Sequence, residues 1–394
     1  MNENNTTVEV NDTETCSEQE NDYCSHLPKV KNDTASPVIV AISVFMLVFA
    51  VILAIAVTLI GGDFTASRPP SYTDESDIPS VIVPDGNESG NKITDNRERP
   101  TLPSHVNAKE DKTAYRPKDS ENASAISFES GRSSDVALLV DLSSGEIVAS
   151  KDADKVVQIA SMTKVMTLIV ACDYIENTEM LYASVELEYS DERLKGYNKA
   201  FVSDSITKET VYVVDLLYGL ILFSGADCAY GLAEGFAGSE AAFVEKMNKK
   251  AKAIGMNDTN FTNCVGKDDG GKNVSTMRDT ATMLTYALQN ELCRNILSSS
   301  KWECVGRYKK PTSLWYLGAI PSTVHDTMKN FSNSSLKCGD VTVLGGKSGY
   351  ENMSGYCLVS FAKNADGKEY VCVCAGNKDN AYNDTVAVYK AYAK

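Results

Sequence analysis

Three short motifs place side chains suited to acyl-transfer chemistry along a chain of 394 residues. They are Ser161-Met162-Thr163-Lys164, Ser224-Gly225-Ala226-Asp227 and Lys347-Ser348-Gly349-Tyr350. A serine hydroxyl is a poor nucleophile until a base within hydrogen-bond reach removes its proton. Lys164 follows Ser161 by three residues, a spacing that places both side chains on one face of a helix. Together the motifs suggest a serine acyl enzyme that uses lysine, not histidine, to activate its nucleophile.

A lysine acts as a base near neutral pH only if its pKa falls well below the usual value of about 10.4. Burial lowers the pKa, and so does a nearby positive charge, which Lys347 would supply if it approached Lys164. Backbone N–H groups at a helix start have no intrahelical partner, so a serine there is also placed to bind a developing oxyanion. The competing interpretation is that Ser161 only caps a helix, which is the ordinary role of an isolated Ser-x-x-Lys motif.

Spacing alone does not discriminate, because other Ser-x-x-Lys tetrads begin at Ser205, Ser298, Ser334 and Ser360. Histidine chemistry is disfavoured, since His325 is the only histidine in the part of the chain that we expect to fold. One histidine makes a Ser-His-Asp triad improbable. It also disfavours a zinc carboxypeptidase, which usually binds its metal through more than one histidine. We therefore expect neither a metal nor a cofactor.

The elements that must position these motifs alternate between helix-like and strand-like segments from residue 123 to residue 394. Helices are expected over 161–176, 210–223, 226–236, 239–254, 278–297 and 385–392. Strands are expected over 136–140, 146–150, 341–345, 356–362 and 370–375, and residues 141–145 carry a hairpin signal. Antiparallel strands early and late with helices between them predict an α+β domain.

An uncharged apolar run over residues 38–60 precedes that domain, and it is long enough to cross a bilayer of about 30 Å as a helix. It follows a long polar stretch and exceeds the core of a signal peptide, so a cleavable signal is disfavoured. Lys29 and Lys31 favour a cytoplasmic side for the tail, residues 1–37, which we expect to be disordered. Residues 61–122 hold seven of the eleven prolines and are expected to form a flexible linker. The folded domain, residues 123–394, would then lie outside the cell.

Charge and cysteine content narrow the function further. The formal net charge of −15 argues against nucleic acid as a partner, because phosphate binding needs a concentrated basic face. Eleven cysteines form no recognisable disulfide framework, and we interpret those of the domain as buried apolar thiols. Cys372 and Cys374 alternate with valines and should share one face of a strand.

Residues 125–394 resemble the catalytic domain of the low-molecular-mass penicillin-binding proteins, the serine D-alanyl-D-alanine carboxypeptidases. The segment Ile159-Ala160-Ser161-Met162-Thr163-Lys164 is similar to the nucleophile motif of that family. The string Phe243-Val244-Glu245-Lys246-Met247-Asn248 and its continuation to Asn263 resemble the helix and loop that follow the second motif. Residues 275–279 and 355–359 also match. The resemblance implies a β-lactamase/transpeptidase-like domain, an antiparallel sheet flanked by helices.

The resemblance also implies a role for each residue of the three motifs. Ser161 would be the acylated nucleophile, Lys164 its base, and Ser224 a proton relay toward the leaving D-alanine. Lys347 and Ser348 would hold the terminal carboxylate of the substrate. The backbone N–H groups of Ser161 and Tyr350 would form the oxyanion hole, and Gly349 completes the substrate-binding motif. The substrate would be a peptidoglycan stem peptide, and β-lactams would trap the acyl-serine.

The chain departs from the family pattern at three places, which leaves alternatives open. Ala226 stands where an asparagine is expected, and Ser348 stands where a threonine is usual. An arginine that many members carry after the last strands is missing, and Lys378 would be a weaker anion contact. Losing one preorganised donor costs about 10²–10³ in rate, so a slow enzyme is expected. The alternatives are a non-catalytic wall or β-lactam binder of the same fold and a β-lactamase, which is disfavoured because no Glu-x-x-Leu-Asn follows the second motif.

Overall fold

The computed structural model describes residues 109–128, 133–188, 192–309, 316–331 and 335–394. The predicted tail, the apolar run over residues 38–60 and most of the predicted linker lie outside these described residues. Within the described part of the chain, no helix is long and apolar enough to cross a membrane.

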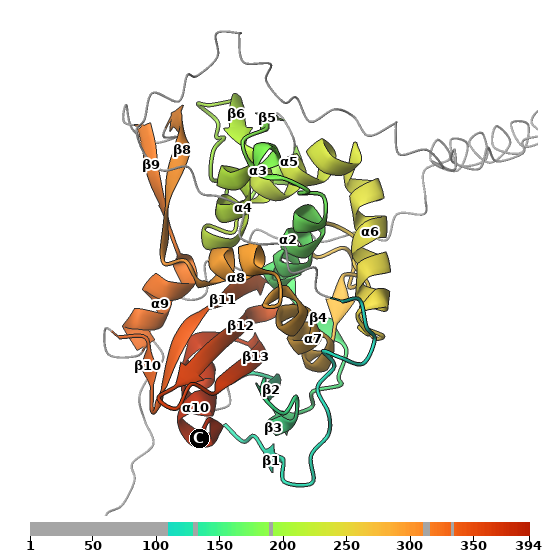
Figure 1. Ribbon diagram of the computed structural model, residues 1–394, viewed down its shortest axis with the longest axis vertical. Coiled ribbons are helices and arrows are strands. Elements are labelled where there is room, and N and C mark those ends of the chain that lie inside the picture. Colours follow the sequence, from blue (N-terminus) through green and yellow to red (C-terminus); the bar gives the residue numbers. More distant parts are fainter. Residues whose placement is uncertain (1–108, 129–132, 189–191, 310–315, 332–334) are drawn as a thin grey trace, which may run out of the picture. The chain divides into compact units, whose positions relative to one another are not determined.

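A seven-stranded sheet organises the domain, with the strand order β1-β3-β2-β13-β12-β11-β10 (Figure 1). Its strands are β1 (Ser124–Ala125), β2 (Val136–Asp141), β3 (Ile147–Lys151), β10 (Lys337–Cys338), β11 (Val341–Glu351), β12 (Gly355–Asn364) and β13 (Glu369–Asn377). Neighbouring strands are antiparallel except for the β1–β3 pair. Early and late strands of the chain therefore share one sheet, because β2 pairs with β13.

Both faces of this sheet are buried, which explains why its strands are apolar without alternation. Along β2, Leu138 faces one core cluster and Leu139 faces the other. The thiols of Cys372 and Cys374 lie 4.0 Å apart in the second cluster, as the shared strand face predicts. All nine cysteines in the described residues are free and buried, which confirms the prediction of apolar thiols there.

Helices cover the two faces unequally. The helices on the face of the first cluster are α2 (Lys164–Asp173), α3 (Thr178–Leu181), α4 (Val213–Leu222), α5 (Ala226–Ala237), α6 (Glu240–Ala253), α7 (Met277–Ala287) and α8 (Glu291–Ser298). The α9 (Thr323–Phe331) and α10 (Ala381–Tyr392) helices contribute to the second cluster. Among the residues that the structure describes, two 3₁₀ helices, η2 (Ala160–Thr163) and η3 (Glu192–Leu194), and three two-stranded sheets complete the fold. These sheets pair β4 (Val157–Gln158) with β7 (Val274–Ser275), β5 (Ser184–Glu188) with β6 (Lys208–Tyr212), and β8 (Lys301–Lys309) with β9 (Tyr316–Pro321).

Most expected elements are present, and the differences have local causes. The helix expected from residue 210 begins at Val213, because Thr210 to Tyr212 pair with β5. The helix expected over residues 278–297 is two helices, and the Asn290 side chain caps the second by accepting the Cys293 N–H at 3.1 Å. The strand expected over residues 341–345 continues to Glu351, so the third motif lies within β11.

The predicted linker over residues 61–122 also overlaps the folded part of the chain, because residues from 109 onward pack against the domain. Arg116 donates to Asp279 Oδ1 at 2.6 Å and to the Gly255 carbonyl at 3.0 Å. Arg278 reaches back to Asp119 at 2.9 Å. Charged side chains in this proline-containing segment therefore have partners on the domain, which composition does not reveal.

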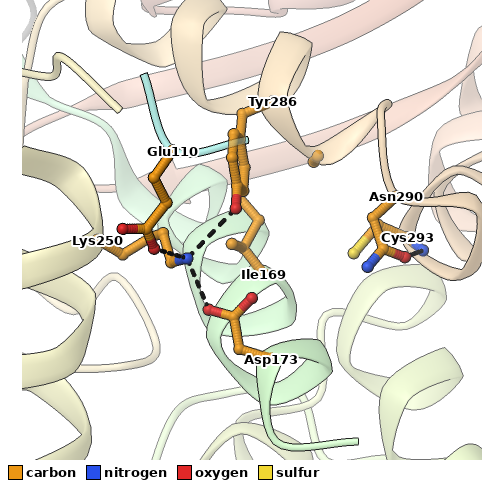
Figure 2. Close-up of a pocket in the computed structure, with 8 residues that line it drawn as sticks. Glu110, Ile169, Asp173, Lys250, Tyr286, Asn290 and Cys293 are labelled. Atoms are coloured by element: carbon orange, nitrogen blue, oxygen red, sulfur yellow. Dashed lines mark hydrogen bonds and ion pairs between the residues drawn. The ribbon is translucent and has the colours of Figure 1, made fainter. Parts of the chain in front are cut away.

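A cavity of about 380 Å³ lies where this segment meets α2, α6 and α7. Figure 2 shows the Lys250 Nζ atom surrounded by Glu110, Asp173 and Tyr286. It lies 2.9 Å from the Asp173 carboxylate and 3.2 Å from the Tyr286 hydroxyl. The lysine is thus neutralised by acidic neighbours, and we interpret it as an attachment of the 109–122 segment to the domain.

Candidate active site

The first motif folds as a 3₁₀ turn that leads into α2. Ser161 lies in η2 and Lys164 is the first residue of α2. A 3₁₀ helix has about three residues per turn, so the two side chains lie one above the other. The Lys164 Nζ atom is 3.0 Å from Ser161 Oγ. The predicted contact between serine and lysine is therefore present, although the turn is tighter than the α-helical turn that we expected.

A loop from a distant part of the chain holds Lys164 in place. The Val265 carbonyl accepts a hydrogen bond from Lys164 Nζ at 2.7 Å. Asn263 shapes this loop, because its side-chain oxygen accepts the N–H groups of Gly266 and Lys267 at 2.8 and 2.9 Å. Gly266 has φ +85°, and a Cβ there would lie 2.0 Å from the Ala160 carbonyl. Val265 carries no signal in the sequence, because it acts through its backbone carbonyl.

Burial gives Lys164 the properties of a base. Its side chain is 1% exposed. That burial lowers the pKa of Lys164 to about 8, against the opposing effect of negative groups that include Glu351. At pH 8, a substantial fraction of the molecules therefore carries a neutral Lys164 side chain, which is the form that accepts a proton.

The second motif holds a serine in a strained conformation next to a second lysine. Ser224 has φ +61°, in the left-handed region that costs a residue other than glycine about 1–3 kcal/mol. The Lys347 Nζ atom lies 2.9 Å from Ser224 Oγ and 2.6 Å from the Ser348 carbonyl. Lys347 is fully buried, and its pKa is lowered well below the usual value by burial and then by the charge of Lys164.

The third motif runs along β11 beside the nucleophile. A Cβ on Gly349 would lie 2.8 Å from the Ser161 backbone nitrogen, so only glycine permits this approach. The Ser348 side chain lies near the phenol of Tyr382 on α10. Tyr350 is 52% exposed, and its ring centroid lies 4.5 Å from that of Tyr356. The structure thus brings Lys347 to Ser224 and Gly349 to Ser161, whereas the Ser348 side chain lies on the side of β11 near α10.

The competing candidates have other partners. Ser298 Oγ donates to the Arg294 carbonyl at 2.8 Å, and Ser360 Oγ lies 3.0 Å from the Tyr389 hydroxyl. Ser205 Oγ lies 3.1 Å from Ser203 Oγ, and Ser334 lies outside the described residues. The two ring nitrogens of His325 lie 2.8 Å from Ser322 Oγ and 3.0 Å from the Leu344 carbonyl. Of these tetrads, Ser161 and Lys164 have the contact that activation of a nucleophile requires.

The departures from the family pattern lie at well-defined positions. Ala226 is fully buried at the start of α5, and its N–H donates to the Asn198 carbonyl at 2.8 Å. The Asn198 side chain donates to the Phe223 carbonyl at 3.2 Å. Asn198 therefore holds the turn that precedes Ser224. Lys378 is exposed just beyond β13, and its proposed contact with an anion stays a prediction.

Asp227, the last residue of the second motif, attaches the segment that follows Asn198 to α5. Its buried carboxylate accepts the backbone N–H groups of Ala200, Phe201, Val202 and Cys228 at 2.8–3.2 Å. Asp227→Ala leaves several of these donors unsatisfied and is expected to lower the free energy of unfolding by about 3 kcal/mol. Urea denaturation measures the change, and Asp366→Ala in an exposed turn is the matched control. Equal stability of the two variants would contradict this role of Asp227.

Two serine–lysine pairs at the side of an antiparallel sheet define a class of proteins, the serine acyl enzymes with a lysine base. The chain belongs to the D-alanyl-D-alanine carboxypeptidase family (peptidase S11), whose family model matches residues 122–378. The predicted family is thereby confirmed.

Individual relatives agree with this assignment. The chain is 25% identical over 274 residues to D-alanyl-D-alanine carboxypeptidase DacF of Bacillus subtilis, covering 70% of this chain and 64% of that protein. It is 30% identical to a D-alanyl-D-alanine endopeptidase of Escherichia coli, covering 57% and 65%, and 30% identical to a carboxypeptidase of Streptomyces sp. K15, covering 58% and 75%. The match thus spans just under two thirds of the length of the first two relatives.

Solved structures show the same fold. A point mutant of the Streptomyces K15 DD-transpeptidase aligns with a TM-score of 0.56 at 24% identity, covering 68% of this chain and all of that one. A D-alanyl-D-alanine carboxypeptidase from Mycobacterium tuberculosis aligns with a TM-score of 0.55 at 23% identity, covering 67% and 92%. The predicted α+β domain of the β-lactamase/transpeptidase type is confirmed by these alignments.

Proposed function

We propose that this protein is a serine D-alanyl-D-alanine carboxypeptidase that removes the terminal D-alanine of peptidoglycan stem peptides. The observation that carries the proposal is the contact of 3.0 Å between Ser161 Oγ and the buried Nζ atom of Lys164. Membership of the family and the second pair, Ser224 and Lys347, support it.

In the acylation step, neutral Lys164 takes the hydroxyl proton of Ser161 while Oγ attacks the carbonyl carbon of the penultimate D-alanine. The backbone N–H groups of Ser161 and Tyr350 stabilise the oxyanion. The C–N bond then breaks as Ser224 passes its hydroxyl proton to the leaving nitrogen and regains one from protonated Lys164, so that free D-alanine departs and Lys164 is neutral again. Water adds to the acyl-serine ester while Lys164 accepts a proton from it, and Lys164 returns that proton to Ser161 Oγ as the ester C–O bond breaks.

Lys347 binds the terminal carboxylate of the substrate in this mechanism. Burial and the charge of Lys164 depress the pKa of Lys347, so it holds a proton weakly in the absence of an anion. An arriving carboxylate favours the protonated form, and the resulting positive charge in turn favours neutral Lys164. Binding of a substrate with a free carboxylate therefore promotes the state in which Lys164 is a base. β-Lactams carry a comparable carboxylate and would acylate Ser161.

The rate should depend on pH through Lys164. Because this base acts only when neutral, kcat for D-alanine release at saturating substrate, where the bound carboxylate keeps Lys347 protonated, should rise with pH and level off above the Lys164 pKa of about 8. Below pH 7 the slope should approach about tenfold per pH unit. Initial rates of D-alanine release from pH 5.5 to pH 9.5 measure the profile. A rate that does not depend on pH between 6 and 9 would argue against a lysine base.

We also propose that the protein is anchored in the cell membrane by residues 38–60, with its catalytic domain on the cell-wall side. The apolar length of that run and the stem-peptide substrate support this arrangement. Protease added to intact protoplasts should digest the domain and spare a tail epitope within residues 1–37. Protection of the domain would contradict the topology.

Turnover distinguishes a carboxypeptidase from a binder of the same fold, an alternative that Ala226 motivates. The full-length protein in detergent is incubated with a pentapeptide ending in D-Ala-D-Ala, with and without prior titration by fluorescent penicillin. We expect many molecules of D-alanine per protein, abolished by one equivalent of penicillin. Penicillin labelling without D-alanine release would support the binder, and continuous penicillin hydrolysis would support a β-lactamase.

A further inference from the structure

Cys264, the residue before Val265, is held at both of its backbone polar groups. Thr167 Oγ1 on α2 donates to the Cys264 carbonyl at 2.6 Å. Glu240, the first residue of α6, accepts the Cys264 N–H on its Oε1 atom at 3.2 Å. Because the Val265 carbonyl follows directly, these two contacts determine where the acceptor lies that binds Lys164 Nζ at 2.7 Å.

The Glu240 carboxylate is itself fixed by its surroundings. Its Oε2 atom lies 3.4 Å from the Arg193 guanidinium in η3. Arg193 is paired with Glu234 at 2.6 Å, and its guanidinium lies 4.3 Å from the centre of the Tyr230 ring. The helix α6 favours a negative charge at its start, where Ser239 forms the cap. One carboxylate thus connects α6 and η3 to the turn that binds Lys164.

The position of the Val265 carbonyl decides how Lys164 faces Ser161. A neutral amine has one lone pair, and an N–H donated to a fixed carbonyl sets the direction of that lone pair. The same carbonyl lies 3.4 Å from Ser161 Oγ, whereas Lys164 Nζ lies 3.0 Å from it. A shifted carbonyl would therefore change both the orientation of the base and the direction of the serine hydroxyl, and proton transfer depends on this geometry.

We propose that Glu240 is a positioning residue for Lys164. It holds the Cys264 N–H so that the Val265 carbonyl directs the Lys164 amine at Ser161. Cys264 is fully buried, so its N–H without Glu240 would be an unsatisfied donor, and the turn would have to move to find another acceptor. This inference rests on the proposed function, in which Lys164 is the base, and adds a residue outside the three motifs.

Single-turnover acylation of the full-length protein by fluorescent penicillin tests the proposal. Its rate constant does not depend on the fraction of protein that is unfolded. Glu240→Ala should lower this rate constant about 10–100-fold, the range expected for a misplaced catalytic group. The kcat for D-alanine release should fall by a similar factor, whereas KM should stay within about twofold because Lys347 is untouched.

Two further variants separate the acceptor from other properties of the side chain. Glu240→Gln keeps an oxygen that accepts the Cys264 N–H, so it should recover most of the lost rate. Glu245→Ala removes an exposed carboxylate from the same helix and is the matched control, which should acylate at the wild-type rate.

A double variant shows whether Glu240 acts through Lys164. In the Lys164→Met background, labelling is followed over hours, and adding Glu240→Ala should change the residual rate by no more than about twofold. Two residues that serve the same step have non-additive effects, whereas a general loss of structure would lower the rate by the same factor in both backgrounds.

The outcomes separate this inference from the proposed function. Acylation of Glu240→Ala at the wild-type rate would overturn the positioning role, and so would a Glu240→Gln variant as slow as Glu240→Ala. Equal factors in the two backgrounds would also overturn it, because Glu240 would then act independently of Lys164. A wild-type protein that neither forms an acyl-enzyme nor releases D-alanine would instead refute the proposed function.

Discussion

Ser161→Ala is expected to lower D-alanine release by at least about 10⁴-fold, because the variant lacks the oxygen that becomes acylated. The change removes one atom from a partly buried turn, so the fold and peptide binding should persist. Initial rates with a pentapeptide substrate measure the loss, and urea denaturation checks stability. Ser298→Ala is the matched control, because Ser298 belongs to another Ser-x-x-Lys tetrad and donates to the Arg294 carbonyl.

The control should keep the wild-type rate. If Ser161→Ala retained more than about one hundredth of the activity, the acyl-serine mechanism would fail, since removal of a nucleophile costs more than loss of a single stabilising contact.

Lys164→Met is expected to lower kcat/KM about 10²–10⁴-fold, the usual contribution of a general base. Methionine approximates the length of the lysine stem and suits a site that is 1% exposed, but it accepts no proton. Acylation by penicillin should slow by a similar factor, because the same proton must leave Ser161. The residual rate should also lose its rise toward pH 8. Stopped-flow acylation with fluorescent penicillin and steady-state D-alanine release measure the two effects.

Lys363→Met provides the control, since this exposed lysine closes another Ser-x-x-Lys tetrad. The two lysines of the site can also be told apart. Loss of Lys347 should raise KM for peptides with a free terminal carboxylate, whereas loss of Lys164 should lower kcat. A variant at Lys164 that acylates at the wild-type rate would show that another group is the base.

The sequence predicts the residues of the site better than it predicts their supports. Ser161, Lys164, Ser224 and Lys347 are identifiable because their side chains carry the chemistry and their spacing constrains it. The Val265 carbonyl, which binds Lys164, has no side-chain signature. The position of this carbonyl depends on a turn that Asn263 and Gly266 shape. The need for glycine at residue 266 is evident only from the structure, in which the turn packs against Ala160.

Element boundaries deviate where tertiary pairing overrides local pattern. Thr210 to Tyr212 continue an apolar helical pattern, yet they pair with β5 because β-branched residues fit a strand as well. The strand expected to end at Gly345 continues through the third motif, because β12 provides partners as far as Glu351. The Ser348 contact with Tyr382 likewise depends on how α10 packs on the sheet.

Mass spectrometry of the acylated protein tests the central claim most directly. The full-length protein is incubated with a slowly hydrolysed penicillin, its intact mass is measured, and the modified peptide is sequenced. We predict one penicillin adduct per chain, located on Ser161 and absent from Ser161→Ala. An adduct on another residue, or a protein that releases D-alanine without forming an adduct at Ser161, would contradict the account.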